Sequence, residues 1–288
     1  MLVQVDVLRR LTKREFGIIE VKSATSLKSH HVFGSGYISR AKVPHRNTII
    51  NYMGNDRLTA FLLSLIEHSA RLLAPFEEDF AMDSTGYTTS RVSWSDYKKG
   101  KEDRCSQHDW VKVHLACGVR THVVTAVVIK GQNAADSPQF RRLLAVTHGG
   151  FRVKAIMADK GYSSIENMQL VADIGATPFI AFTKTATGAG GGMFSKMFHY
   201  LRLHPDEFYE RYHQRSNVEA AFSMMKRKFA GRLRSRTETA MKNETLCKVL
   251  CHNIAVLNHA MYSLGVEFDF AHSRLIEPIG VTDSRQAA

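Results

Sequence analysis

Cysteine and long apolar runs are scarce in this sequence, and each shortage excludes a class of protein. Four cysteines, unevenly spaced along 288 residues, are too few for a disulfide framework and favour a reducing compartment. The longest apolar stretches, such as 61–66 and 123–129, are far shorter than the roughly 18 residues that cross a bilayer, so we expect no membrane span. Residues 1–10 alternate apolar and charged side chains and do not form a secretory signal. We therefore expect a cytoplasmic protein.

Acidic residues are also in short supply, because 27 Asp and Glu stand against 39 Lys and Arg and leave a formal net charge of +12. Residues 211–242 alone hold nine basic residues against two acidic ones, a net charge of +7. A basic surface attracts polyanions, and the abundant polyanion in a cell is nucleic acid. Taken by itself, such a run is equally typical of a solvated helix face.

The composition, with 44% hydrophobic and 23% charged residues, is that of a folded protein with one large domain and an appendage or with two small domains. The periodicity predicts strands at 80–84, 112–119, 122–130, 153–158 and 177–182. It predicts helices at 48–73, 137–147, 163–174, 205–212 and 217–229, and a flexible glycine-rich loop at 187–192. The order from residue 80 onward is βββαβαβα. We expect an α/β fold in which three antiparallel strands are extended by parallel ones and helices cover both faces.

Three acidic residues occupy positions of possible chemical importance. Asp83 and Asp159 each follow an apolar run at a predicted strand end, where a carboxylate is costly to bury unless it is paired or coordinates a metal. Taken singly, each is more typical of a turn. Glu219 shares one stripe with Arg215 and Lys226 in a predicted helix. The alternative is an ordinary amphipathic helix in which Arg215 and Glu219 form an ion pair.

The spacing Tyr212-x2-Arg215-x3-Glu219-x6-Lys226 resembles the signature of bacterial and archaeal insertion-sequence transposases of the DDE type. Further segments resemble the same family: 82–87 (Met-Asp-Ser-Thr-Gly-Tyr), 110–114 (Trp-Val-Lys-Val-His), 158–162 (Ala-Asp-Lys-Gly-Tyr), 226–228 (Lys-Arg-Lys) and 246–253 (Leu-Cys-Lys-Val-Leu-Cys-His-Asn). The resemblance covers residues 45–262.

The resemblance implies a ribonuclease-H-like catalytic domain at 78–262, a helical N-terminal segment at 1–77 and a C-terminal tail at 263–288. Members of the family usually carry more chain before the first aspartate. We therefore expect residues 1–77 to include a truncated DNA-binding region.

The resemblance also implies that Asp83, Asp159 and Glu219 are the catalytic carboxylates and hold two Mg²⁺ or Mn²⁺ ions. Carboxylate oxygens suit these hard cations. Two ions about 4 Å apart can act on the attacking and the leaving oxygen of a phosphodiester. The residues expected to contact DNA are Tyr212, Arg215, Lys226, Lys112, His114, Arg227 and Lys228.

The implied function is metal-dependent cleavage of DNA at transposon ends and strand transfer into target DNA. By resemblance, we expect a homodimer on DNA in a prokaryotic cytoplasm, associated with the nucleoid. Two alternatives stay open: a metal-dependent nuclease without strand transfer, and a domesticated or decayed transposase that only binds DNA.

A zinc site is a further alternative, because four potential ligands have a C-x2-H-x5-H-x2-C spacing. These ligands are Cys105, His108, His114 and Cys117. The predicted strand begins between the two pairs, and its extended backbone would keep them apart. We therefore favour a role of His114 near the carboxylates.

Overall fold

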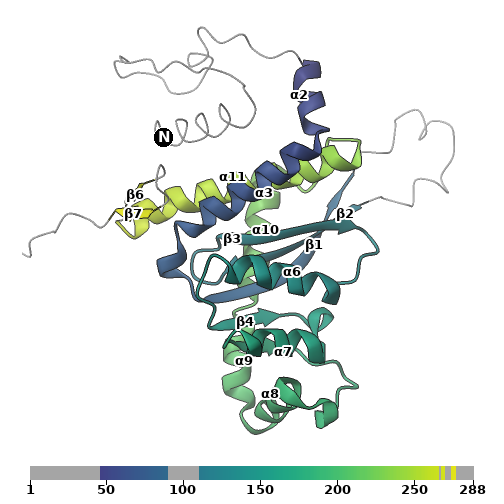
Figure 1. Cartoon of the computed structure of the whole chain (residues 1–288), viewed down its shortest axis with the longest axis vertical. Helices are drawn as coiled ribbons and strands as arrows, with labels where there is room; N and C mark the ends of the chain where they lie inside the picture. Colours follow the sequence, from purple (N-terminus) through teal and green to yellow (C-terminus); the bar gives the residue numbers. More distant parts are fainter. Residues whose placement is uncertain (1–45, 90–109, 266, 270–273, 277–288) are drawn as a thin grey trace, which may run out of the picture.

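The computed structural model describes residues 46–89, 110–265, 267–269 and 274–276, and its centre is a five-stranded mixed sheet (Figure 1). The strand order is β3-β2-β1-β4-β5. The strands are β1 (Asp79–Thr88), β2 (Trp110–Gly118), β3 (Val124–Gly131), β4 (Ala155–Ala158) and β5 (Thr177–Ile180). The first three are antiparallel, whereas β4 and β5 run parallel to β1. The predicted βββαβαβα order and ribonuclease-H-like mixed sheet are confirmed.

Helices cover both faces of the sheet because the strand side chains alternate between two apolar clusters. Phe80 and Met82 of β1 belong to the cluster that includes Phe140 of α6 (Ser137–His148) and residues of α7 (Ile165–Asp173). Ala81 and Tyr87 of β1 belong to the cluster formed with α3 (Asp56–Arg71), α10 (Ser216–Phe229) and α11 (Glu238–Ser263). Odd-numbered residues of β1 therefore face α10.

Helix α3 shares this second cluster, through Leu62 and Ile66, with residues of β2 and α10. Figure 1 shows α3 and α11 lying side by side, and both contact β3. The last part of the segment before residue 78 is therefore packed against the sheet. The short strands β6 (Glu267–Asp269) and β7 (Arg274–Ile276) form a separate hairpin.

The helix predicted at 48–73 is two helices, α2 (Arg46–Met53) and α3. Glycine disfavours a helix interior, and the break falls at Gly54. Asn55 then caps α3, because its side-chain oxygen accepts a hydrogen bond from the Arg57 amide at 2.9 Å. Pro75 lies in the 3₁₀ turn η1 (Ala74–Phe76) that follows α3.

The glycine-rich segment predicted as a flexible loop contains the 3₁₀ turn η3 (Gly188–Gly190) and leads directly into helix α8 (Gly192–Leu203), which the sequence reading missed. Gly191 and Gly192 have φ values of 68° and 54°, which glycine adopts without strain. No side chain caps α8, so the usual sign of a helix start is absent. Within the described ranges, none of the helices is both long and apolar enough to cross a bilayer.

Candidate active site

Neighbouring parallel strands place the two aspartates. Met82 of β1 is paired with Ala158 of β4, so Asp83 and Asp159 are the next residues along each strand. By the alternation of the sheet, both fall on the face that carries α10. Asp159 occupies the N-cap position of the 3₁₀ turn η2 (Lys160–Tyr162), but its side chain makes no capping hydrogen bond. The Asp159 carboxylate therefore does not stabilise the start of this turn.

Glu219 comes to the same face from the first turn of α10. This helix is fixed on the sheet by Val218, Ala221 and Met225, which are fully buried. The Glu219 side chain is 54% exposed, whereas that of Asp83 is 18% exposed. The three predicted carboxylates therefore approach one edge of the buried interface from two strands and one helix.

The pKa of Asp83 shows that the three charges interact. Burial raises the pKa of Asp83 above its usual value, and the negative charges of Asp159 and Glu219 raise it further. The Ser84 amide, which donates to Asp83 Oδ1 at 2.7 Å, and the Arg215 guanidinium oppose that rise. The site is therefore one in which negative charge accumulates and a cation is stabilising.

Arg215 supplies such a cation between two of the carboxylates. Its Nη1 lies 2.8 Å from Asp83 Oδ2, and its Nη2 lies 2.6 Å from Glu219 Oε1. The ion pair with Glu219 that the sequence offered as the alternative is thus present, but it is one half of a bridge to β1. Helix α9 (Pro205–His213) ends before Arg215, so Tyr212 does not share a helix with Glu219.

The donor atoms fit a hard divalent cation, because all three residues offer carboxylate oxygens and lie within electrostatic reach of one another. Across the ranges that the structure describes, however, no three acidic, histidine or cysteine side chains converge closely enough to hold an ion. We attribute the separation of the carboxylates to Arg215, whose guanidinium lies between Asp83 and Glu219. Asp83, Asp159 and Glu219 would hold a metal only once that guanidinium moves away.

Two further predicted DNA contacts flank the carboxylates. Lys226 Nζ donates to Thr85 Oγ1 at 2.6 Å and lies 5.6 Å from the centre of the Tyr87 ring. Burial lowers the pKa of Lys226. The Tyr212 ring is half-buried and stacks on Phe208 with centroids 6.2 Å apart. Burial raises the pKa of Tyr212, and the charge of Asp159 contributes to that rise.

Lys112 and His114 lie on the opposite face of the sheet, so the expectation that His114 contacts DNA is not supported by its position. His114 is paired across the strands with Ser84, and its side chain is 0% exposed. Its Nδ1 lies 3.1 Å from Tyr162 Oη, and burial lowers the pKa of His114 to about 4. Lys112 Nζ lies 2.8 Å from Asp136 Oδ1. A buried imidazole cannot reach DNA at the surface.

The zinc alternative fails for the two ligands that the structure describes. His114 and Cys117 are three residues apart in β2, so their side chains point to opposite faces of the sheet. Cys117 accordingly belongs to the cluster beneath α10, whereas His114 contacts Tyr162. Cys105 and His108 lie outside the described residues.

Asp136 is a residue that the sequence reading missed, and it connects the supports of both aspartates. Its Oδ1 accepts from the Ser84 hydroxyl at 3.0 Å and lies 3.3 Å from His114 Nδ1. Ser84 follows Asp83 directly. Gly161, two residues after Asp159, packs so closely that a Cβ atom there would lie 2.9 Å from Asp136 Oδ2. Its signal in the sequence is weak, an acid directly before the Ser-Pro pair that begins α6, and Asp136 makes no capping hydrogen bond there.

Arg227 and Lys228 are exposed at the end of α10, but they do not lie beside the carboxylates. They line a pocket that also includes Arg120, which no sequence motif singled out, and His252, which lies in the segment 246–253 but was given no role. The basic end of α10 therefore belongs to a second surface.

Comparison with known proteins agrees with this geometry. The model of the Transposase DDE domain family matches residues 74–254, a span that contains Asp83, Asp159 and Glu219. No match was found among curated proteins. Members of this family generally use divalent metal ions to act on DNA. Because the matched span is more than half of the chain, the protein belongs to the family of transposases with a DDE domain, enzymes that cleave and transfer DNA.

Proposed function

We propose that this chain cuts DNA at the ends of an insertion element and joins the freed 3′ hydroxyl to target DNA. The observation that carries the proposal is the approach of Asp83, Asp159 and Glu219 to one edge of the sheet, with a single guanidinium between two of them. A purely structural ion pair would need only one carboxylate. Three interacting carboxylates beside a guanidinium suit a metal-dependent phosphoryl transfer.

In this proposal Asp83, Asp159 and Glu219 hold two Mg²⁺ or Mn²⁺ ions. When bound, such ions supply activation of the attacking oxygen and stabilisation of the leaving oxygen. Arg215 leaves the carboxylates and binds a DNA phosphate through its two parallel N–H groups. Lys226, held by Thr85 two residues from Asp83, places a point charge beside the same strand.

The reaction consists of two displacements at phosphorus. In the first, water attacks the scissile phosphodiester, and the bond to the 3′ oxygen breaks, which leaves a 3′ hydroxyl and a 5′ phosphate. In the second, that hydroxyl attacks a target phosphodiester and displaces the target 3′ oxygen. The enzyme forms no covalent intermediate, so no nucleophilic side chain is required at the site.

Two ends must be joined to one target, so we propose that two copies of the chain act together on DNA, in the nucleoid of a prokaryotic cytoplasm. The basic segment 211–242 contributes the attraction to DNA.

The test uses linear duplexes that carry the repeats flanking the gene, with or without a pre-formed 3′ hydroxyl end, a supercoiled target plasmid and Mg²⁺. We expect joining of the pre-cleaved duplex to the plasmid, seen as labelled circular and linear products. Cleavage without joining would indicate a nuclease. Metal-independent binding with neither reaction would indicate a protein that only binds DNA.

A further inference from the structure

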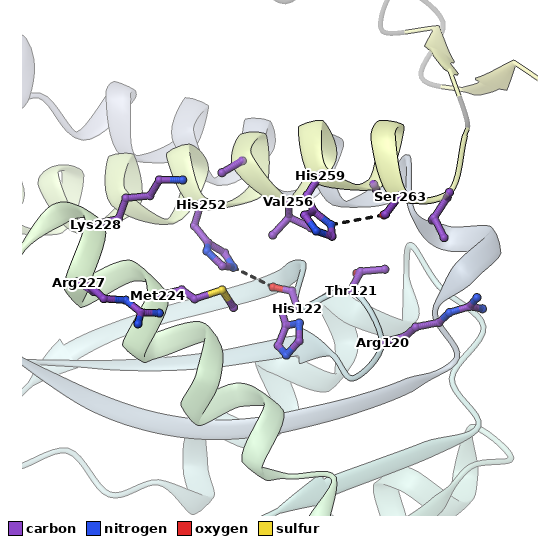
Figure 2. A pocket seen from close by; sticks show the side chains of 13 residues that line it. Arg120, Thr121, His122, Met224, Arg227, Lys228, His252, Val256, His259 and Ser263 are labelled. Atoms are coloured by element: carbon purple, nitrogen blue, oxygen red, sulfur yellow. Dashed lines mark hydrogen bonds between the residues drawn. The ribbon is translucent and has the colours of Figure 1, made fainter.

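A basic pocket lies between the second half of α10, the last turns of α11 and the turn between β2 and β3 (Figure 2). It has a volume of about 780 Å³. Arg120, Arg227 and Lys228 supply cations at its lining, and three imidazoles join them from His122, His252 and His259. Among the residues that the structure describes, no carboxylate lines it.

This pocket is separate from the carboxylates, because the two lie on opposite flanks of α10. At 100° per residue, Glu219 and Lys226 fall on one side of the buried face, and Met224 and Lys228 fall on the other. Glu219 and Lys228 are nine residues apart, which corresponds to about 13 Å along the helix axis. The pocket is therefore a second surface at a defined distance from the reacting groups.

The cations of the pocket are only partly compensated by acidic groups. In the described part of the chain, Arg227, Lys228 and the Arg120 side chain form no ion pair, although many other basic residues do. The buried Glu77 accepts hydrogen bonds from the backbone amides of Arg120 and Thr121, and it attracts the Arg120 guanidinium electrostatically without pairing with it. Positive charge that is only partly compensated at a concave surface favours an anionic ligand.

The turn that forms one wall is held rigidly from two sides. Glu77 binds it from the edge of the sheet, and His252 of α11, which is 3% exposed, contacts the His122 carbonyl through Nε2 at 2.9 Å (Figure 2). His122 has a φ of 63°, which is uncommon for a residue other than glycine and requires support from its surroundings. The wall is thus preformed, as binding sites usually are.

The outward side of α10 joins the pocket to the carboxylates without an acidic obstacle. Ser216, Ala220, Ser223 and Arg227 follow one another at the spacing of a single helix stripe. The first three are small, so a DNA backbone could pass over the helix closely before it reaches Arg227 and Lys228.

We propose that this pocket binds phosphate groups of the DNA backbone outside the cleavage site, an inference that rests on the proposed function. Arginine matches phosphate with paired N–H groups, and lysine adds a point charge. The axial separation of about 13 Å alone corresponds to roughly four nucleotides of B-form DNA at 3.4 Å each. Because the two sites also lie on opposite flanks of α10, the pocket holds the strand at least about four nucleotides away from the phosphate that is cut.

The first test compares the double variant Arg120→Gln/Lys228→Gln with a control that loses the same charge on α8, Lys196→Gln/Arg202→Gln. Binding of a 20-bp duplex is measured in EDTA over a range of salt concentrations. Each lost phosphate contact reduces the magnitude of the slope of log K against log salt by about 0.9. We expect the pocket variant to lose about two such contacts and the control to lose none. Equal slopes in the two variants would overturn the proposal, provided that both unfold at the wild-type temperature.

The second test places single neutral methylphosphonates along the end duplex. We expect weaker wild-type binding when the substitution lies at a position about four or more nucleotides from the cleaved phosphate, and no such effect at that position in the pocket variant. Interference that persists in the variant would overturn the proposal. Because binding is measured without metal ions, a chain that binds in this way but never cleaves would refute the proposed function and leave the pocket assigned.

Discussion

At the scale of single residues, the guanidinium of Arg215 determines the charge balance between Asp83 and Glu219. It stands between Asp83 and Glu219 and compensates charges that would otherwise repel each other. If a divalent ion binds as we propose, it would compete with Arg215 for the same two carboxylates when DNA is absent.

Replacing Arg215 with alanine should accordingly raise the affinity for Mn²⁺ in the absence of DNA by roughly tenfold, or about 1.4 kcal/mol. The same variant should lose DNA cleavage, because no bidentate phosphate contact replaces the guanidinium. Titration calorimetry measures the first effect. Arg211→Ala is the matched control, since Arg211 binds Asp79 at 3.0 Å and makes no contact with the three carboxylates. An unchanged or lower Mn²⁺ affinity in the Arg215 variant would contradict the competition.

The buried imidazole of His114 should make the fold sensitive to acid. It packs against Asp136, Lys112 and Tyr162, and burial holds its native pKa at about 4, below the ordinary 6.5. Between these values the unfolded chain binds more protons than the native one, so the free energy of unfolding falls as pH decreases through this window, by at most about 3 kcal/mol.

Denaturant unfolding at pH 7 and at pH 4.5 measures this effect. The difference between the two pH values should shrink in His114→Asn and should stay as in the wild type in His199→Asn, which changes an exposed histidine of α8. If the loss of stability with acid is the same in both variants, His114 is not its source.

At the scale of elements, the connection before α6 and the turn η2 act as supports for the two aspartates from the far face of the sheet. Asp136 contacts the residue after Asp83 and packs on the glycine of η2. This contact adds to the β1–β4 pairing and to the interaction of Tyr162 with Ser84 in fixing the relative positions of the segments that carry Asp83 and Asp159.

Asp136→Asn should reduce cleavage by roughly tenfold to a hundredfold, because displacements near 1 Å have effects of that size on catalysis. DNA binding should change little. Asp173→Asn on α7, whose carboxylate accepts from Gln169 on the surface, is the control. The result that would count against a positioning role is a parallel loss of DNA binding and cleavage.

Helix α11 is tied to the sheet by a buried asparagine. Asn253 is 0% exposed, accepts from the Val124 amide at 2.9 Å and donates to the Val124 carbonyl at 2.8 Å and to Ser69 Oγ at 3.1 Å. Asn253→Ala leaves these buried groups unsatisfied and should cost about 2–4 kcal/mol of unfolding free energy. Cys251→Ala, at an exposed position of the same helix, should cost far less. Equal losses in a urea titration would contradict this role of Asn253.

The order of these elements could be predicted from the sequence, whereas several of their ends could not. Apolar periodicity located each strand of the sheet and separated the helices that correspond to α9 and α10, but it ran straight through Gly54. The glycine itself, which disfavours a helix interior, was the signal of that break. Helix α8 was missed because it begins on glycine without a capping side chain.

At the scale of the whole molecule, the two flanks of α10 have different tasks in this account. One flank brings Glu219 to the aspartates. The other closes the basic pocket with α11 and the turn between β2 and β3 (Figure 2). The grouping of Asp83, Asp159 and Glu219 could be predicted because a local spacing resembles a known signature, whereas their catalytic role stays a prediction. The pocket could not, since Arg120 and His252 meet only through the fold, and the same holds for Asp136 and Gly161.

The central claim is that Asp83, Asp159 and Glu219 form one metal-dependent catalytic site for DNA. The most direct test measures cleavage, in the presence of Mg²⁺, of DNA that contains an end of the element. It compares the Asp159→Asn variant with the Asp173→Asn control. Asparagine keeps the shape of the side chain and removes the charge that a hard cation requires. The account predicts that cleavage is abolished in Asp159→Asn while salt-sensitive DNA binding persists, and cleavage at the rate of the control would contradict it.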